Sequence, residues 1–70
     1  MFTNKGGDFI RITLKAARIN AGLKLVEAAE KIGVSYVTLH NWENGKTHPN
    51  LEKLKKLGEL YELDFTDLRL

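Results

Sequence analysis

Apolar side chains recur at the spacing of an α-helix in two stretches before residue 34. The first runs from Phe9 to Ala21 without Gly or Pro, and its apolar positions fit one helical face: Ile12, Leu14, Ala17 and Ala21. Gly22 follows, and glycine is the usual residue just past a helix end. The second, from about Leu25 to Lys31, is followed by Gly33 and has three residues on its inner side: Ala28, Ala29 and Ile32. We therefore predict two helices, each ended by a glycine.

Polar residues that favour helix starts divide the rest of the chain. Ser35 is a good N-cap, so a third helix follows it and ends at Asn44-Gly45. Residues 46–49 form a loop, because Pro49 keeps the preceding residue out of helical geometry. Asn50 caps a fourth helix whose leucines recur near 3.6 residues: Leu51, Leu54, Leu57 and Leu60. Asp64 caps a last short helix that ends near Leu68. No stretch shows a strand pattern, so the predicted fold is all-α, with five helices.

Length and composition limit the number of domains and the kinds of functional site that the chain can have. Seventy residues make one domain, which we place at residues 9–70 behind a flexible arm of residues 1–8 that contains Gly6-Gly7. The chain has no Cys, and its two histidines, His40 and His48, lie on a helix and a separate loop, so we predict neither a disulfide nor a metal site. The single serine is already used as a cap, and no Gly-rich phosphate loop is present. We therefore predict no cofactor and no enzyme activity.

The charges are unevenly distributed. The net charge is +2, with +3 on residues 1–35 and −1 on residues 36–70. Such a dipolar chain can orient on a phosphate backbone, although chance clustering explains the pattern equally well. The apolar runs are too short to span a membrane and no signal peptide is visible, so we expect a cytoplasmic protein.

The junction "EKIGVSYVT", residues 30–38, combines these signals. Gly33 supplies a sharp turn between two short helices, Val34 offers an apolar plug for the core, and Ser35 caps the next helix. This order is typical of a helix-turn-helix, whose second helix can lie in a DNA major groove. A glycine turn between helices is common, so the junction alone is weak support for DNA binding.

Several linked features together resemble the Cro and CI repressor-like helix-turn-helix regulators, also called the XRE family. They extend over roughly residues 10–68: Leu14, Ala17 and Arg18; Gly22-Leu23; Ala29 followed by "IGVS"; Leu39 followed by "WENGK"; Pro49; Leu51, Leu54 and Leu57; and "LDFTDL". The resemblance implies a lambda-repressor-like domain in which the open face of the third helix reads bases. It also implies that Arg18 and Glu43 form an ion pair, where the alternative is two exposed charges that never meet, and that Trp42 is a core residue.

Four residues at the exposed turns of the third helix are candidates for base reading: Tyr36, Val37, His40 and Asn41. The Asn41 amide suits adenine, and the Val37 methyl groups suit the thymine methyl. Tyr36 fits a base, a phosphate or a sugar, and His40 fits a base or the backbone. We expect phosphate contacts from five more residues: Lys24, Thr38, Asn44, Lys46 and Thr47. Each polar residue taken alone fits an ordinary solvated face equally well.

The chain departs from the family pattern at two places. Lys24-Leu25 replaces the common Thr-Gln, and the loss of the Gln leaves an apolar cluster of Leu25, Val26, Tyr36 and Val37. Glu62 stands where the family tends to have Gly after the fourth helix.

The resemblance implies a sequence-specific regulator of double-stranded DNA, of the small phage-type Cro-like repressor kind, that binds a palindromic operator through the major groove as a homodimer. Because about two residues follow the last predicted helix, we expect no separate effector domain. The rival hypothesis is a protein-interaction module whose partner binds the cluster of Leu25, Val26, Tyr36 and Val37, since exposed apolar clusters often mark protein partners.

Overall fold

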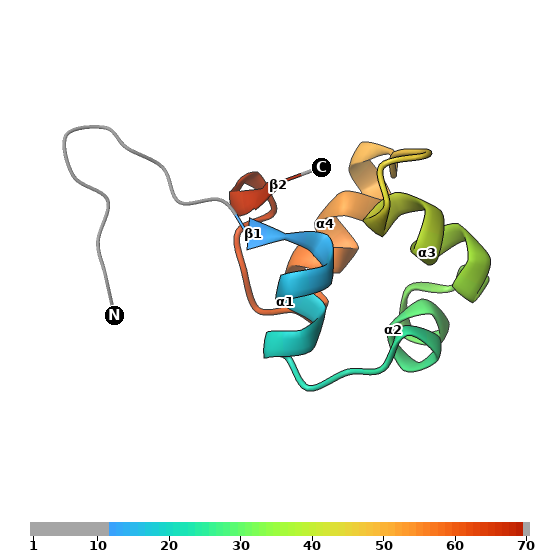
Figure 1. Ribbon diagram of the computed structural model, residues 1–70. Coiled ribbons are helices and arrows are strands. Elements are labelled where there is room, and N and C mark those ends of the chain that lie inside the picture. Colours follow the sequence, from blue (N-terminus) through green and yellow to red (C-terminus); the bar gives the residue numbers. More distant parts are fainter. Residues whose placement is uncertain (1–11, 70) are drawn as a thin grey trace, which may run out of the picture.

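The computed structural model describes residues 12–69, and Figure 1 shows its helices packed around one another. The described residues form four α-helices, one 3-10 turn and two short strands: β1 (Ile12–Thr13), α1 (Leu14–Asn20), α2 (Leu25–Ile32), α3 (Tyr36–Glu43), α4 (Leu51–Leu60), η1 (Phe65–Asp67) and β2 (Leu68–Arg69). The fold is thus mainly helical, with four α-helices in residues 12–69, and a 3-10 turn stands where a fifth helix was predicted. None of the helices in residues 12–69 is long and apolar enough to cross a membrane.

Helix α1 begins five residues later than predicted. The backbone of Thr13 is extended, and its hydroxyl accepts a hydrogen bond from the Ala16 N–H at 3.1 Å, which caps the helix at Leu14. The residues before Leu14 pair instead with the end of the chain, as a parallel β1–β2 pair in which Ile12 lies opposite Leu68. The predicted absence of strands is therefore wrong, and so is the predicted burial of Ala21, which is the exposed C-cap. The remaining part of the predicted helix, residues 9–11, and the predicted arm lie outside the described residues.

The predicted turn between the second and third helices is confirmed. Gly33 ends α2 with a left-handed backbone (φ +86°), which allows the Val34 N–H to bond the Ala29 carbonyl at 3.0 Å. Val34 packs against the core, and the Ser35 hydroxyl accepts a hydrogen bond from the Thr38 N–H at 3.1 Å, which starts α3. Helices α2 and α3 are therefore a helix-turn-helix.

The chain makes a left-handed turn after α4 at Glu62, where the family tends to have Gly. Glu62 has φ +58°, a left-handed conformation that costs an L-residue about 1–2 kcal/mol. The turn lets the Leu63 N–H bond the Gly58 carbonyl at 2.8 Å. Asp64 then accepts a hydrogen bond from the Thr66 N–H at 3.0 Å, which lowers the pKa of Asp64 and caps a 3-10 turn of three residues. The chain passes directly into β2, so no fifth α-helix forms.

The core lies between α1, α2, α3 and α4. Its ten buried apolar residues are Leu14, Ala17, Ala28, Ala29, Ile32, Leu39, Trp42, Leu57, Tyr61 and Leu68, so the prediction that Trp42 is a core residue holds. Leu51, by contrast, is 57% exposed in the first turn of α4 and takes no part in the core. Gly58 is buried where the chain returns towards η1, and a Cβ at this position would lie 2.9 Å from the Leu63 carbonyl oxygen.

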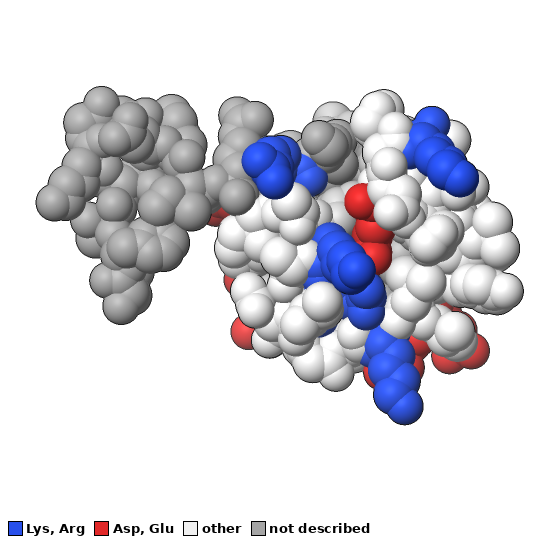
Figure 2. Space-filling model, in the orientation of Figure 1, with Lys and Arg blue, Asp and Glu red and all other residues white. Residues whose placement is uncertain are grey.

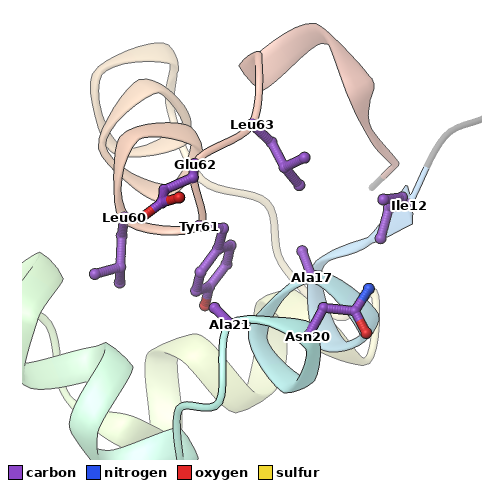
Figure 3. A pocket seen from close by; sticks show the side chains of 8 residues that line it. All are labelled: Ile12, Ala17, Asn20, Ala21, Leu60, Tyr61, Glu62 and Leu63. Atoms are coloured by element: carbon purple, nitrogen blue, oxygen red, sulfur yellow. The ribbon is translucent and has the colours of Figure 1, made fainter. Parts of the chain in front are cut away.

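Among the described residues, Tyr61 carries a buried polar atom without a hydrogen-bond partner. The side chain is only 5% exposed, and its hydroxyl has no hydrogen-bond partner among the described residues. Burial, together with the negative charge of Glu43, raises the pKa of Tyr61 to about 12. Figure 3 shows its ring beside a hollow of about 330 Å³ between the end of α1 and the end of α4.

Candidate nucleic-acid interface

Helix α3 has one buried and one open face. Leu39 and Trp42 are buried, whereas Tyr36, Val37 and His40 are exposed and Asn41 is half-buried. Val37, His40, Asn41 and Asn44 follow the helical i, i+3, i+4, i+7 spacing, so they share the open face. This places the four residues that sequence reasoning assigned to base reading on the outer side of the helix, at its first two turns.

An ion pair joins α1 to the end of α3. Arg18 Nε donates to Glu43 Oε2 at 2.7 Å, and Arg18 Nη2 donates to Glu43 Oε1 at 3.2 Å. Arg18 Nη1 also donates to the Leu23 carbonyl at 3.0 Å, so the guanidinium connects α1, the turn before α2, and α3. The hydrogen bonds to Glu43 outweigh desolvation and raise the pKa of Arg18. The pair fixes the position of the open face relative to the other helices.

The polar side chains of α3 and of its C-cap differ in whether they already make hydrogen bonds within the protein. The Thr38 hydroxyl lies 3.0 Å from the Ser35 hydroxyl, and the Asn44 amide nitrogen donates to the His40 carbonyl at 2.8 Å. The same nitrogen lies 3.3 and 3.2 Å from the two ring nitrogens of His40. The Asn44 amide nitrogen is therefore already engaged with His40, which weakens the assignment of Asn44 as a phosphate contact. The Asn41 amide makes no side-chain hydrogen bond within residues 12–69 and is free to bind a base.

Basic groups surround this face. Figure 2 shows a largely uncharged surface over α3, with Lys and Arg side chains above, below and beside it and acidic side chains in the middle and at the lower right of the view. The Lys24 side chain is exposed and makes no capping bond, because an ammonium group has no acceptor for a backbone N–H. The Lys24 backbone N–H donates to Glu27 Oε1 at 2.8 Å. Lys46 and Thr47 are exposed, and the Lys46 N–H bonds the Asn41 carbonyl at 2.9 Å, which holds this loop against the end of α3. The charged rim and uncharged centre suit a duplex whose phosphates flank a groove.

The comparisons with known proteins agree with this geometry. The sequence pattern of the family HTH_3, described as helix-turn-helix, matches residues 14–68. The chain belongs to the HTH_3 helix-turn-helix family. The match agrees with the resemblance to helix-turn-helix domains of the XRE, Cro and CI type.

Two relatives show how far the likeness of this helix-turn-helix protein extends. It is 31% identical over 64 residues to a provisionally named HTH-type transcriptional regulatory protein of Sulfurisphaera tokodaii, which covers 87% of the chain and 22% of the relative. It is 31% identical over 55 residues to the HTH-type transcriptional activator BcrR of Enterococcus faecalis, which covers 79% of the chain and 27% of the relative. The chain thus spans about a quarter of the length of these relatives. No solved structure matches it significantly.

Sequence reasoning missed one cationic residue of the helix-turn-helix protein. Arg69 is not among the predicted DNA contacts, but β2 places it at a hollow of about 420 Å³ beside the end of α3. Thr13, Asn44 and Gly45 line the same hollow. The signal that could have found Arg69 is the pairing of β1 with β2, and a two-residue strand leaves no periodicity to detect.

The apolar cluster is smaller than predicted. Leu25 is half-buried and packs against the core, so it does not belong to an exposed surface. Val26, Tyr36 and Val37 are 52%, 56% and 51% exposed. All three belong to the two helices of the helix-turn-helix, and we call them the apolar trio.

Proposed function

We propose that this helix-turn-helix protein binds double-stranded DNA sequence-specifically by placing α3 in the major groove. The observation that carries the proposal is the open face of α3, where uncommitted groups sit on a helix fixed from behind by Leu39, Trp42 and the Arg18–Glu43 pair. Tyr36, Val37, His40 and Asn41 contact bases, with Asn41 bonded to adenine. In this proposal the protein acts in the cytoplasm.

The phosphate contacts follow from the surrounding charges. Lys24, before α2, and Lys46, after α3, supply cations, and the exposed Thr47 hydroxyl supplies a hydrogen-bond donor. Arg69 adds a third cation from β2. Thr38 and Asn44 contribute only after exchanging their internal hydrogen bonds for bonds to phosphate.

Two copies bind a palindromic operator in this proposal. Helix α3 has eight residues and is therefore about 12 Å long, close to the rise of three or four base pairs. One copy reads too few base pairs to define a rare site, whereas two copies on half-sites one helical turn apart double the number. A Cro-type repressor acts in this way, by occupying DNA that the transcription machinery needs. A reporter gene behind the operator distinguishes this from activation, the activity named for BcrR.

Selection from a random duplex pool tests the proposal. We expect an enriched motif with two half-sites about ten base pairs apart, and binding that weakens steeply with salt. Asn41→Ala should reduce affinity for the motif by about 1–3 kcal/mol and relax the preference at one base pair. An equal loss on every sequence would reassign Asn41 to the backbone, and a pool without enrichment would refute specific DNA binding.

The exposure of the apolar trio favours a second candidate, a protein partner on the same surface. Apolar protein contact responds little to salt, whereas phosphate-mediated binding responds strongly. The salt titration therefore separates the two candidates.

A further inference from the structure

The side chains of α3 define which bases it can read. The helix Tyr36–Glu43 contains no Lys or Arg, and its single carboxylate, Glu43, is held by Arg18. Arg and Lys reach the O6 and N7 atoms of guanine and make the commonest specific contact to a base, while Asp and Glu accept from cytosine. Helix α3 offers neither kind of group to the groove, so it lacks the strongest readers of a G·C pair.

The groups that α3 does offer match an A·T pair. The Asn41 amide is uncommitted within residues 12–69, and an Asn amide bonds N6 and N7 of adenine together. Val37 lies one turn before Asn41 on the same face, and its exposed methyl groups complement the C5-methyl of thymine. One helical turn rises 5.4 Å against 3.4 Å per base pair, so these two side chains reach the same or neighbouring pairs.

Contact with A·T pairs also explains why the apolar trio is exposed. Three large apolar side chains, each about half exposed, lie on the two helices that approach the groove. Exposure of these side chains to water is unfavourable, and the phosphate backbone of DNA offers them no apolar partner. Thymine methyl groups are the apolar feature of the major groove.

We infer that each half-site is A·T-rich where α3 contacts it, and that the trio of Val26, Tyr36 and Val37 reads thymine methyl groups there. The inference rests on the proposed DNA binding and adds to it the chemistry of the preferred base pairs. Specificity then comes from one amide and several methyl contacts, with the affinity supplied by the cations around them.

Replacing thymine by deoxyuracil tests the inference, because it removes the methyl group and leaves base pairing intact. Each thymine of the selected motif is replaced in turn, and the dissociation constant is measured for the full chain. We expect a three- to fivefold loss at the thymines that α3 contacts, which corresponds to the burial of one methyl group. Thymines outside the motif should show no effect.

A double-mutant cycle assigns the effect to Val37, the member of the trio that lies one turn before Asn41. Val37→Thr keeps the shape of the side chain and replaces one methyl group by a hydroxyl, and Val37→Ala shortens it at an exposed position, so both variants should fold. At one thymine these variants should abolish the loss caused by deoxyuracil. Ile19→Ala is the matched control, since Ile19 is 56% exposed on α1, and it should leave that loss unchanged.

The outcomes separate the inference from the proposed function. A selected motif with G·C pairs at its most restricted positions, or unchanged affinity for every deoxyuracil duplex, overturns the inference while DNA binding stands. The same holds if the trio variants lose a protein partner but bind DNA normally. A pool with no enriched sequence overturns the proposed function itself.

Discussion

Removal of Arg18 should destabilise the protein far more than a surface charge would. The Arg18 side chain is 12% exposed and that of Glu43 is 5% exposed, and two hydrogen bonds join them. Arg18→Ala leaves the Glu43 carboxylate without its partner in a nearly dry site and also removes a donor from the Leu23 carbonyl. Loss of one partner of such a pair costs about 3–5 kcal/mol, against a few tenths for two exposed charges.

Urea denaturation followed by the fluorescence of Trp42, the only tryptophan, measures this cost. A domain of this size has roughly 4–10 kcal/mol of stability, so Arg18→Ala stands near the limit of what the fold tolerates. Arg18→Lys is the milder companion, because it keeps a charge but loses the two-point geometry. Replacement of both residues by packed apolar side chains should cost much less than Arg18→Ala, since no charge is then stranded.

The coupling energy of a double-mutant cycle shows whether Arg18 and Glu43 stabilise the protein as a pair. From Arg18→Ala, Glu43→Ala and the double variant we expect a coupling of about 2–3 kcal/mol. A value below about 0.5 kcal/mol would refute the reasoning, because the two groups would then contribute independently. DNA affinity of the folded fraction should fall as well, since the pair fixes α3 against α1.

Four further predictions concern stability and charge. Gly58→Ala should lower the free energy of unfolding by about 1–3 kcal/mol in urea titrations, because the new methyl group meets backbone; a gain would show that the chain shifts freely. Glu62→Gly should raise it by about 1 kcal/mol in the same assay, and no gain would argue against strain at φ +58°. Tyr61→Phe should be neutral or stabilising by about 1 kcal/mol at pH 7. The pKa of Tyr61 is about 12 in the folded protein and 10 in the unfolded chain, so the wild type loses stability as the pH rises from 10 to 12. The free energy of unfolding of Tyr61→Phe relative to the wild type should therefore increase by roughly 1 kcal/mol between pH 9 and 11. Lys46→Ala should weaken binding to specific and random DNA alike and lower the salt slope by about one unit, whereas Lys56→Ala, in a hollow between α2 and α4, should leave the slope unchanged.

The elements that local chemistry specifies could be predicted from the sequence. Ser35 and Asn50 cap their helices through their own side chains, and Gly33 supplies the left-handed turn, so the bounds of α2, α3 and α4 follow from neighbouring residues. The start of α1 could not be predicted in this way. The residues before Leu14 are acceptable in a helix, and pairing with the far end of the chain, more than fifty residues away, places Ile12 in a strand.

In the candidate site, too, some features could be predicted from the sequence and others depend on the folded structure. Family-matched positions placed Val37, His40 and Asn41 on one face of α3, and Arg18 beside Glu43. Residue type alone could not reveal that the Asn44 amide turns back to the His40 carbonyl, because its rotamer decides this. It also could not reveal that Arg69 lies near the end of α3, because that depends on β2.

The β1–β2 pair has a consequence for how such a domain is built into proteins. Because β1 and β2 are parallel and Ile12 lies opposite Leu68, the chain enters and leaves the described fold at neighbouring positions but in opposite directions. A larger protein can therefore carry the unit in line, between one segment that leads into β1 and another that continues from β2. The chain matches each of the two relatives over only about a quarter of the relative's length.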